Sequence, residues 1–245
     1  MTETTNLDDL HVPRSVVDGI GEERAASLVA QSIPVNVTWW NERLERHGLP
    51  GGPVLARNAR GSTVESGIGR ITRGDVFEIG GTDLTDVGNV CRLLWHSLAW
   101  GAGLHVRACD QRMKAVEDGG ASLFQSLSKA AELSRRDCTN AYLTVCPAPH
   151  QNLVKHMGPA FATKFLYFSG AGSRDHPCLI LDRVVATALR TIGGWSDISL
   201  TGFWPVSTYD RYCNLAHRWA RDASGIVGRT VSPDEIELAL FKNGR

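Results

Sequence analysis

The chain has 245 residues, with 26 Lys and Arg against 26 Asp and Glu, so its formal charge is zero. This length is enough for one large domain or two smaller lobes around a hydrophobic core. Because the total charge is zero, it does not indicate that the protein as a whole binds a polyanion. Its apolar runs are shorter than the roughly 18 residues of a membrane helix, and the acidic start "MTETTNLDDL" is not typical of a secretory signal. We therefore expect a soluble, cytoplasmic protein.

The cysteine pattern argues against the common metal sites. The chain has six cysteines but no CxxC pair and no histidine near them at metal-ligand spacing. Scattered cysteines in a chain of this size are typical of small buried hydrophobic side chains in a reducing compartment. We therefore expect no metal site and no cofactor.

The hydrophobic pattern indicates a mainly α protein. Apolar residues recur at i, i+3, i+4 and i+7, the spacing of one helix face, whereas strict alternation is nearly absent. The expected helices, in chain order, are Glu22–Gln31, Val37–His47, Leu84–Trp100, Ser122–Arg136, Gln151–Met157, Pro159–Ser169, Arg183–Ile192, Tyr209–Ala223 and Pro233–Lys242.

A glycine-rich segment from Gly48 to Gly81 interrupts this pattern. We expect a long connection there that holds a short strand pair or a turn of helix, and that marks a lobe boundary or a mobile loop. Its arginines outnumber its acidic residues, so phosphate contact is one interpretation. Solvated loop charge is the other interpretation, and we favour it. The arginines are Arg57, Arg60, Arg70 and Arg73.

The stretch from Cys138 to Arg174 contains no Asp or Glu, but it contains Lys155 and Lys164. Such a stretch can form a locally positive surface on a neutral protein. A chance distribution of charge explains the pattern equally well, and both interpretations stay open at this point.

In "LVKHMGPAFATKFLYF", Gly158 and Pro159 mark a boundary between two helices. Glycine suits a left-handed helix stop and proline suits the first position of the next helix, so we expect a tight hairpin. The amides around Ala160 and Ala162 would then lack intrahelical partners and could hold a DNA phosphate. The predicted DNA contacts are Gly158, Ala160, Ala162 and Lys155.

One lysine and one aspartate border apolar helix faces just after this boundary. Lys164 lies about sixty degrees to the side of a stripe of three phenylalanines. Asp182 stands at the N-cap position of the next helix. Each residue alone has a structural alternative: a surface lysine whose stem covers apolar atoms, and an ordinary helix cap. Their joint occurrence favours a catalytic pair. The phenylalanines are Phe161, Phe165 and Phe168.

These residues resemble the helix-hairpin-helix superfamily of base-excision DNA glycosylases, whose signature is a hairpin, a lysine just after it and an aspartate further on. The matching residues are Thr163-Lys164 and "LILDRVVATAL". The pattern "GPAFATKFLYF" followed by "DRVVATAL" is most similar to the 8-oxoguanine glycosylase branch, including its compact archaeal and bacterial members. The resemblance covers residues 151–192. The family hairpin carries glycines where this chain has Ala160 and Ala162, and alanine restricts how closely the backbone approaches phosphate.

The resemblance implies a mainly α, two-lobed fold with the active-site cleft between the lobes. We expect one helical lobe from residues 1–70 plus 183–245. We expect a central helical lobe from residues 71–182, which ends in the helix-hairpin-helix at about 151–169.

The resemblance also implies a mechanism. Lys164 would attack C1′ of a deoxyribose whose base has been flipped out, and the resulting Schiff base can lead to an AP-lyase step. Only the uncharged amine attacks, and burial beside phenylalanines favours that form. Asp182 would stabilise the positive charge on the sugar or activate the nucleophile. The expected partner is double-stranded DNA with a modified base, bound by a monomer.

The substrate stays open between two kinds of base. One is an oxidised guanine such as 8-oxoguanine, which implies DNA repair. The other is a hypermodified phage base such as glucosylated hydroxymethylcytosine, which implies antiphage defence. The alternative function is a non-catalytic helix-hairpin-helix DNA-binding module, and a helical interaction protein unrelated to DNA comes last.

Aromatic side chains that can sandwich a flipped base occur in helix Leu84–Trp100 and in "GFWPVSTYDRYC". We name Trp100 and Trp204 as base-pocket candidates. Core packing is the more common role of any single tryptophan, and it remains the alternative for both.

Overall fold

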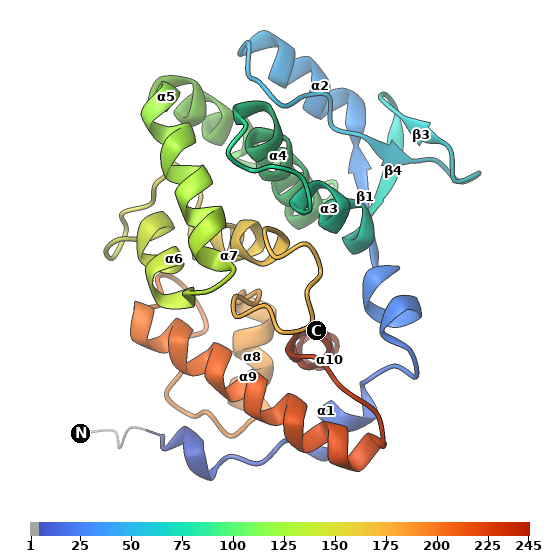
Figure 1. Ribbon diagram of the computed structural model, residues 1–245, viewed down its shortest axis with the longest axis vertical. Coiled ribbons are helices and arrows are strands. Elements are labelled where there is room, and N and C mark those ends of the chain that lie inside the picture. The colour runs from blue at the N-terminus through green and yellow to red at the C-terminus, as the bar shows by residue number, and fades with distance from the viewer. Residues whose placement is uncertain (1–4) are drawn as a thin grey trace.

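The computed structural model describes residues 5–245, and it is mainly helical, which confirms the predicted fold class (Figure 1). Residues 1–4 belong to the predicted first lobe and to the acidic N-terminal stretch, and they lie outside the described residues. A small sheet lies at one side of the molecule, and helix α7 lies near the middle of the molecule.

The N-terminal part begins with short helical turns instead of the long helix expected there. The predicted helix Glu22–Gln31 is reduced to the central turn η2, because the residues after it pair with a distant strand. This is a case in which tertiary pairing overrides local propensity. Helix α2 confirms the predicted helix Val37–His47. The bounds are η1 (Leu7–Asp9), α1 (Arg14–Asp18), η2 (Ala25–Val29), β1 (Ser32–Asn36) and α2 (Val37–Arg46).

The glycine-rich segment contributes three strands and one helix, which confirms the expected strand pair and helical turn. The antiparallel sheet has the order β1-β4-β2-β3, and β1 pairs with β4 from Ser32 opposite Thr72 to Asn36 opposite Ile68. Thr72 caps the helix through a capping box, so Arg73 begins a helix and does not lie in a loop. The bounds are β2 (Ala56–Arg57), β3 (Thr63–Val64), β4 (Ile68–Thr72) and α3 (Arg73–Gly80).

Three helices form the middle of the chain, and α5 packs against both α4 and α6. Helix α5 bends at Gly120, where φ is 52°, and the predicted helix Ser122–Arg136 corresponds to its second part. Helix α6 has no counterpart among the predicted helices. The bounds are α4 (Val87–Ala102), α5 (Cys109–Ser134) and α6 (Cys138–Val145).

The last four helices were all predicted, with ends that differ by a few residues. Helix α7 packs against α3, α4, α5 and α6, while α10 packs against α1, α8 and α9. The contact between α1 and α10 brings the N-terminal and C-terminal parts of the chain side by side. The bounds are α7 (Pro159–Phe168), α8 (Arg183–Thr191), α9 (Val206–Val227) and α10 (Pro233–Asn243).

The prediction of a tight helical hairpin is wrong, because Gln151–Met157 does not form a helix. Residues 146–158 form a longer connection between α6 and α7, with an isolated bridge between Ala148 and Gln151. The predicted left-handed stop at Gly158 is absent: its φ is −66°, and His156 has the positive value of 67°. A helix of seven residues is marginal without a packing partner, so side-chain contacts decide the path here.

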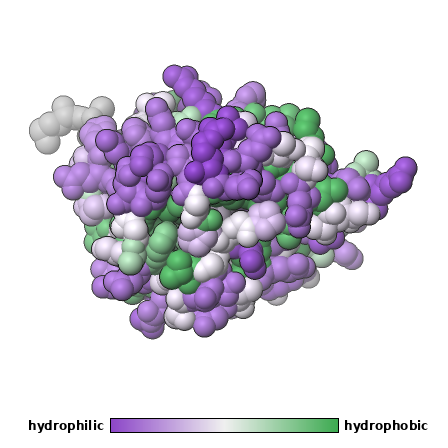
Figure 2. All heavy atoms as spheres, turned by 90° about the horizontal axis from the view of Figure 1, so that it is seen from above, coloured by the Kyte–Doolittle hydropathy of each residue, from purple (hydrophilic) through white to green (hydrophobic). Residues whose placement is uncertain are grey.

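The division into two lobes stays a prediction. Buried hydrophobic residues from Leu7 to Leu240 form one cluster that draws on both predicted lobes. Within residues 5–245, no helix is long and apolar enough to span a membrane. Figure 2 shows hydrophilic residues over most of the face seen from above, with hydrophobic residues only in small separate areas.

Candidate active site

Lys164 lies on α7, and its amine is almost enclosed. The helix begins after Gly158, with Pro159 at its first position, where a missing amide costs nothing. Phe165 and Phe168 are fully buried, and the side chain of Lys164 is only 9 % exposed. Its Nζ donates to the Ala160 carbonyl at 3.1 Å and to Asp182 Oδ2 at 3.0 Å.

Asp182 caps α8, as the sequence predicted, and its two oxygens have different partners. Oδ1 accepts the amides of Val184 at 3.0 Å and Val185 at 3.1 Å, while Oδ2 faces Lys164. Burial opposes ionisation, but the Lys164 charge and the two helix amides outweigh it and lower the pKa of Asp182. The carboxylate is therefore held in its charged form, directed at the amine.

The segment before Asp182 is fixed from two sides. Thr163 Oγ1 lies 3.2 Å from both the amide and the carbonyl of Leu181, so α7 is bonded to the residue that precedes the aspartate. Tyr209 and Tyr212 of α9 each donate at 2.8 Å to carbonyls of the same segment. The distance between the lysine and the aspartate is thus set by the surrounding core.

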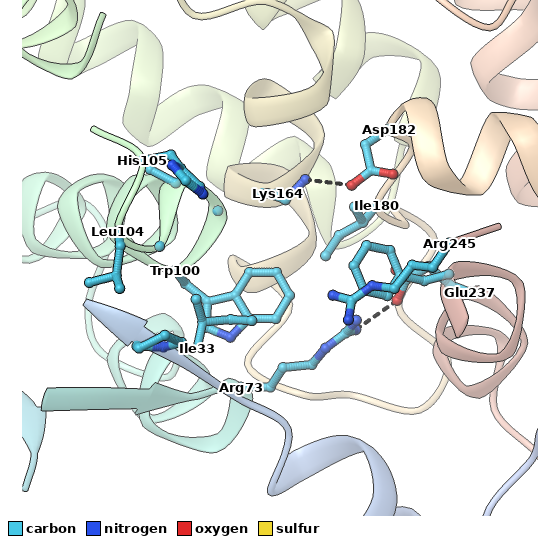
Figure 3. A pocket seen from close by; sticks show the side chains of 15 residues that line it. Ile33, Arg73, Trp100, Leu104, His105, Lys164, Ile180, Asp182, Glu237 and Arg245 are labelled. Atoms are coloured by element: carbon cyan, nitrogen blue, oxygen red, sulfur yellow. Dashed lines mark hydrogen bonds and ion pairs between the residues drawn. The ribbon is translucent and has the colours of Figure 1, made fainter. Parts of the chain in front are cut away.

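Lys164 and Asp182 both line one cavity of about 310 Å³. Figure 3 shows these two side chains pointing toward each other, with a second charged pair, Arg73 and Glu237, on another side of the cavity. The lining draws on both predicted lobes. It consists of Ile33, Pro34, Arg73, Trp100, Gly101, Ala102, Gly103, Leu104, His105, Lys164, Ile180, Asp182, Glu237, Phe241 and Arg245.

The pair of Arg73 and Glu237 was not found from the sequence. Each side chain is 1 % exposed, and Nη1 of Arg73 lies 2.7 Å from Oε2 of Glu237. Burial raises the pKa of Glu237, although the Arg73 charge opposes the shift. Arg73 was interpreted as solvated loop charge, and that interpretation is wrong because the guanidinium enters the cavity wall. Glu237 carried no signal, because nothing in the local sequence distinguishes it from the other residues of the predicted helix Pro233–Lys242.

Gly101 of α4 makes room for the lysine. A Cβ at this position would lie 2.8 Å from Cδ of Lys164 and 3.1 Å from a ring atom of Phe161. The first distance is shorter than a Cβ contact in a folded protein, so a side chain at position 101 would force the lysine stem to shift, and the glycine leaves the stem its present path beside α4.

A family model described as "Putative 8-oxoguanine DNA glycosylase OGG-like protein" matches residues 26–241. The chain belongs to this family. Membership indicates a DNA glycosylase and a protein that binds DNA. The comparisons with curated proteins and with solved structures found no match.

The predicted DNA contacts of this OGG-like family member lie at the start of α7 and just before it. Lys155 is exposed, and Gly158 and Ala160 are partly exposed. Ala162 is fully buried, and its amide already donates to the Gly158 carbonyl at 3.1 Å, so its predicted free amide is wrong. Arg112 of α5 donates to the His156 carbonyl at 2.8 Å and thereby fastens the connection before the helix.

The two tryptophans named for the base pocket lie in different places. Trp100 lines the cavity, and its ring lies 5.1 Å from the Arg73 guanidinium carbon. Trp204 does not line the cavity; its indole donates to the Ser199 carbonyl at 2.8 Å, and its own carbonyl accepts from Tyr142. Trp204 is therefore a packing residue.

Proposed function

We propose that Lys164 and Asp182 are the catalytic pair of a DNA glycosylase that flips out and excises a modified base. The observation that carries the proposal is the 3.0 Å contact between Nζ and Oδ2 at the wall of a cavity that both residues line. A nucleophile within hydrogen-bond reach of its base is the arrangement that covalent catalysis needs. The family match supports the reaction class.

The reaction follows from the two side chains. Asp182 accepts a proton from the Lys164 ammonium, and the free amine forms a bond to C1′ of the flipped nucleotide. The glycosidic bond breaks, its electron pair leaves with the base, and the base takes the proton that Asp182 accepted. Positive charge develops on the sugar as the bond breaks, and the carboxylate that Asp182 regains by giving up the proton stabilises that charge. The Schiff base that forms next is the entry to an AP-lyase step.

The cavity has a size that suits a single base. The cavity volume of about 310 Å³ lies at the lower end of the range of ~300–1,000 Å³ for small-molecule sites. An oxidised guanine such as 8-oxoguanine implies a repair enzyme, and glucosylated hydroxymethylcytosine implies antiphage defence. Trp100 is the aromatic wall against which the base would lie, and Gly158, Ala160 and Lys155 would contact phosphates.

Borohydride trapping on a duplex with an abasic site tests the catalytic role of Lys164. Wild-type protein should form a covalent DNA adduct, and Lys164→Gln should form none. Lys129→Gln is the matched control, because Lys129 is an exposed lysine of α5 outside the cavity. Intact DNA binding without an adduct in the wild type would instead support the non-catalytic DNA-binding module.

The two substrate classes are separated by base release. Duplexes that contain 8-oxoguanine and phage DNA that contains glucosylated hydroxymethylcytosine are incubated with the protein, and free base is measured. Release from the first supports repair and release from the second supports defence. Release from neither removes the support for both substrates.

A further inference from the structure

The second charged pair of the cavity is held more firmly than the first. Arg73 donates through Nη1 to Tyr167 Oη at 3.0 Å and to Glu237 Oε2 at 2.7 Å, and through Nε to the side chain of Gln31. Its guanidinium also lies over the ring of Trp100. A planar guanidinium with this many partners has one orientation, so the atoms that it leaves free point in a fixed direction.

Two polar atoms of this pair are left without partners. Among residues 5–245, Nη2 of Arg73 has no acceptor and Oε1 of Glu237 has no donor. Neither atom is among the unpaired atoms that are fully enclosed by protein. Since both residues line the cavity, we assign the open space beside these atoms to the cavity. The wall thus presents one donor and one acceptor.

Unpaired polar atoms on buried charged groups need an explanation. Desolvating two charges costs several kcal/mol per ion before their attraction is counted, and an apolar pair of similar volume would fill the site at less cost. A group that hydrogen-bonds both free atoms would offset part of this cost. A ligand with an acceptor next to a donor therefore fits this part of the wall.

We propose that Arg73 and Glu237 read the lactam edge of the flipped base, a carbonyl oxygen next to a ring N–H. This inference rests on the proposed function, which brings a base into the cavity, and it adds the class of base. Arg73 Nη2 donates to the carbonyl oxygen, and Glu237 Oε1 accepts the ring N–H. Guanine-type and uracil-type bases carry such an edge.

The opposite edge, an amino group next to a ring nitrogen, fits less well. A carbonyl oxygen carries more negative charge than a ring nitrogen, so the guanidinium favours it. A lactam N–H is more acidic than an aromatic amino group, so the carboxylate favours it as well. Adenine-type and cytosine-type bases present the weaker edge. The pair therefore selects an oxidised guanine over a glucosylated cytosine.

The test measures base binding without catalysis. The protein is bound to a duplex that contains a tetrahydrofuran abasic analogue, which leaves the base cavity empty, and free bases are titrated in by NMR. Hypoxanthine is compared with adenine, and 1-methyluracil with 1-methylcytosine. The methyl group stands where the sugar is attached in DNA and removes the second lactam edge of the free pyrimidines, so each pair differs only at the edge in question. The lactam base of a pair should bind about 10- to 100-fold more tightly, the effect of one hydrogen bond to a charged group.

Three variants complete the test. The double variant Arg73→Gln/Glu237→Gln removes both charges together. If the double variant does not fold, the single variant Glu237→Gln, which keeps Arg73, takes its place. Either variant should reduce the preference for the lactam base to a few-fold. Arg221→Gln, the same change at an exposed arginine of α9 outside the cavity lining, should keep it. Thermal unfolding checks that each variant is folded.

Several outcomes overturn the proposal. These are equal binding of both bases of a pair by the wild type, a preference that survives in folded variants, and binding of none of the four bases. The catalytic proposal fails separately, through borohydride trapping on abasic DNA, because that reaction needs Lys164 and no base in the cavity. A base preference without trapping would leave the recognition role standing and remove the chemistry.

Discussion

Two charged pairs line one cavity, and they differ in how many contacts hold them. The amine of Lys164 has two oxygen partners and belongs to a flexible stem, whereas the Arg73 guanidinium is held by Gln31, Tyr167, Glu237 and the Trp100 ring. A lysine can lose its proton and form a covalent bond, and an arginine cannot be deprotonated in a protein. The first pair therefore suits the proposed reaction, and the second suits a fixed position in the cavity wall.

The largest expected effect comes from removing the reactive amine. Lys164→Gln should lower base excision by at least about 10⁴-fold, because a substituted nucleophile leaves only binding and electrostatic contributions to catalysis. Single-turnover excision on the preferred substrate measures the effect. Lys129→Gln should match the wild type, and residual excision within tenfold of the wild type by Lys164→Gln would disprove the nucleophile.

The second expected effect concerns stability. Arg73→Met leaves a buried carboxylate unpaired and should lower the free energy of unfolding by about 3–5 kcal/mol. The double variant Arg73→Met/Glu237→Met should recover most of this loss, because no buried charge then lacks a partner. Urea unfolding measures both. Equal losses in the single and the double variant would show that the pair does not act as a unit.

Asp182→Asn separates chemistry from helix capping. Asparagine caps a helix about as well as aspartate, so Asp182→Asn should lose the stability of the Lys164 ion pair but keep that of the cap, while excision should fall by about 10²–10³-fold through loss of the carboxylate charge. Asp182→Ala is the matched control, and it should cost about 1 kcal/mol of stability more than Asp182→Asn, because the cap is lost as well. An Asp182→Asn variant with normal excision would contradict the catalytic role.

The smallest expected effect is in the pH dependence of stability, where the two carboxylates should have opposite signs. The lowered pKa of Asp182 gives a contribution that is present above its unfolded value of about 3.9 and is lost as pH falls through the folded value. The raised pKa of Glu237 gives a contribution that is present below about 4.3 and is lost as pH rises through its folded value.

Each carboxylate has its own amide variant for this measurement. Asp182→Asn should flatten the loss of stability on acidification, and Glu237→Gln should flatten the loss on raising the pH. Urea unfolding across a pH series checks both. The same change of slope in both variants would show that the two carboxylates do not differ in the way described.

The sequence predicted the first pair and missed the second for a physical reason. Lys164 and Asp182 lie 18 residues apart, and each position follows from the periodicity and capping of its own helix. Arg73 and Glu237 are 164 residues apart, and nothing local indicates that they meet.

The wrong predictions concern segments whose backbone path is set by contacts with residues far away in the sequence. Residues 151–157 have some helical pattern, but two hydrogen bonds fix another path: the Leu153 amide donates to the Val145 carbonyl, and Arg112 donates to the His156 carbonyl. Trp204 lies in an aromatic stretch that is suited to a base pocket by composition alone. Its position away from the cavity is fixed by the bond of its indole to the Ser199 carbonyl and by the bond from Tyr142 of α6 to its own carbonyl, which composition does not show.

The glycine at position 101 links the stability of α4 to the position of the Lys164 side chain. Alanine in place of a helical glycine generally favours the helix, and Gly101 stands in the last turn of α4, so Gly101→Ala would gain stability if the Lys164 stem moved away from the new methyl group. The same movement would push the proposed nucleophile out of line. Selection for robustness and selection for turnover therefore pull this single position in opposite directions.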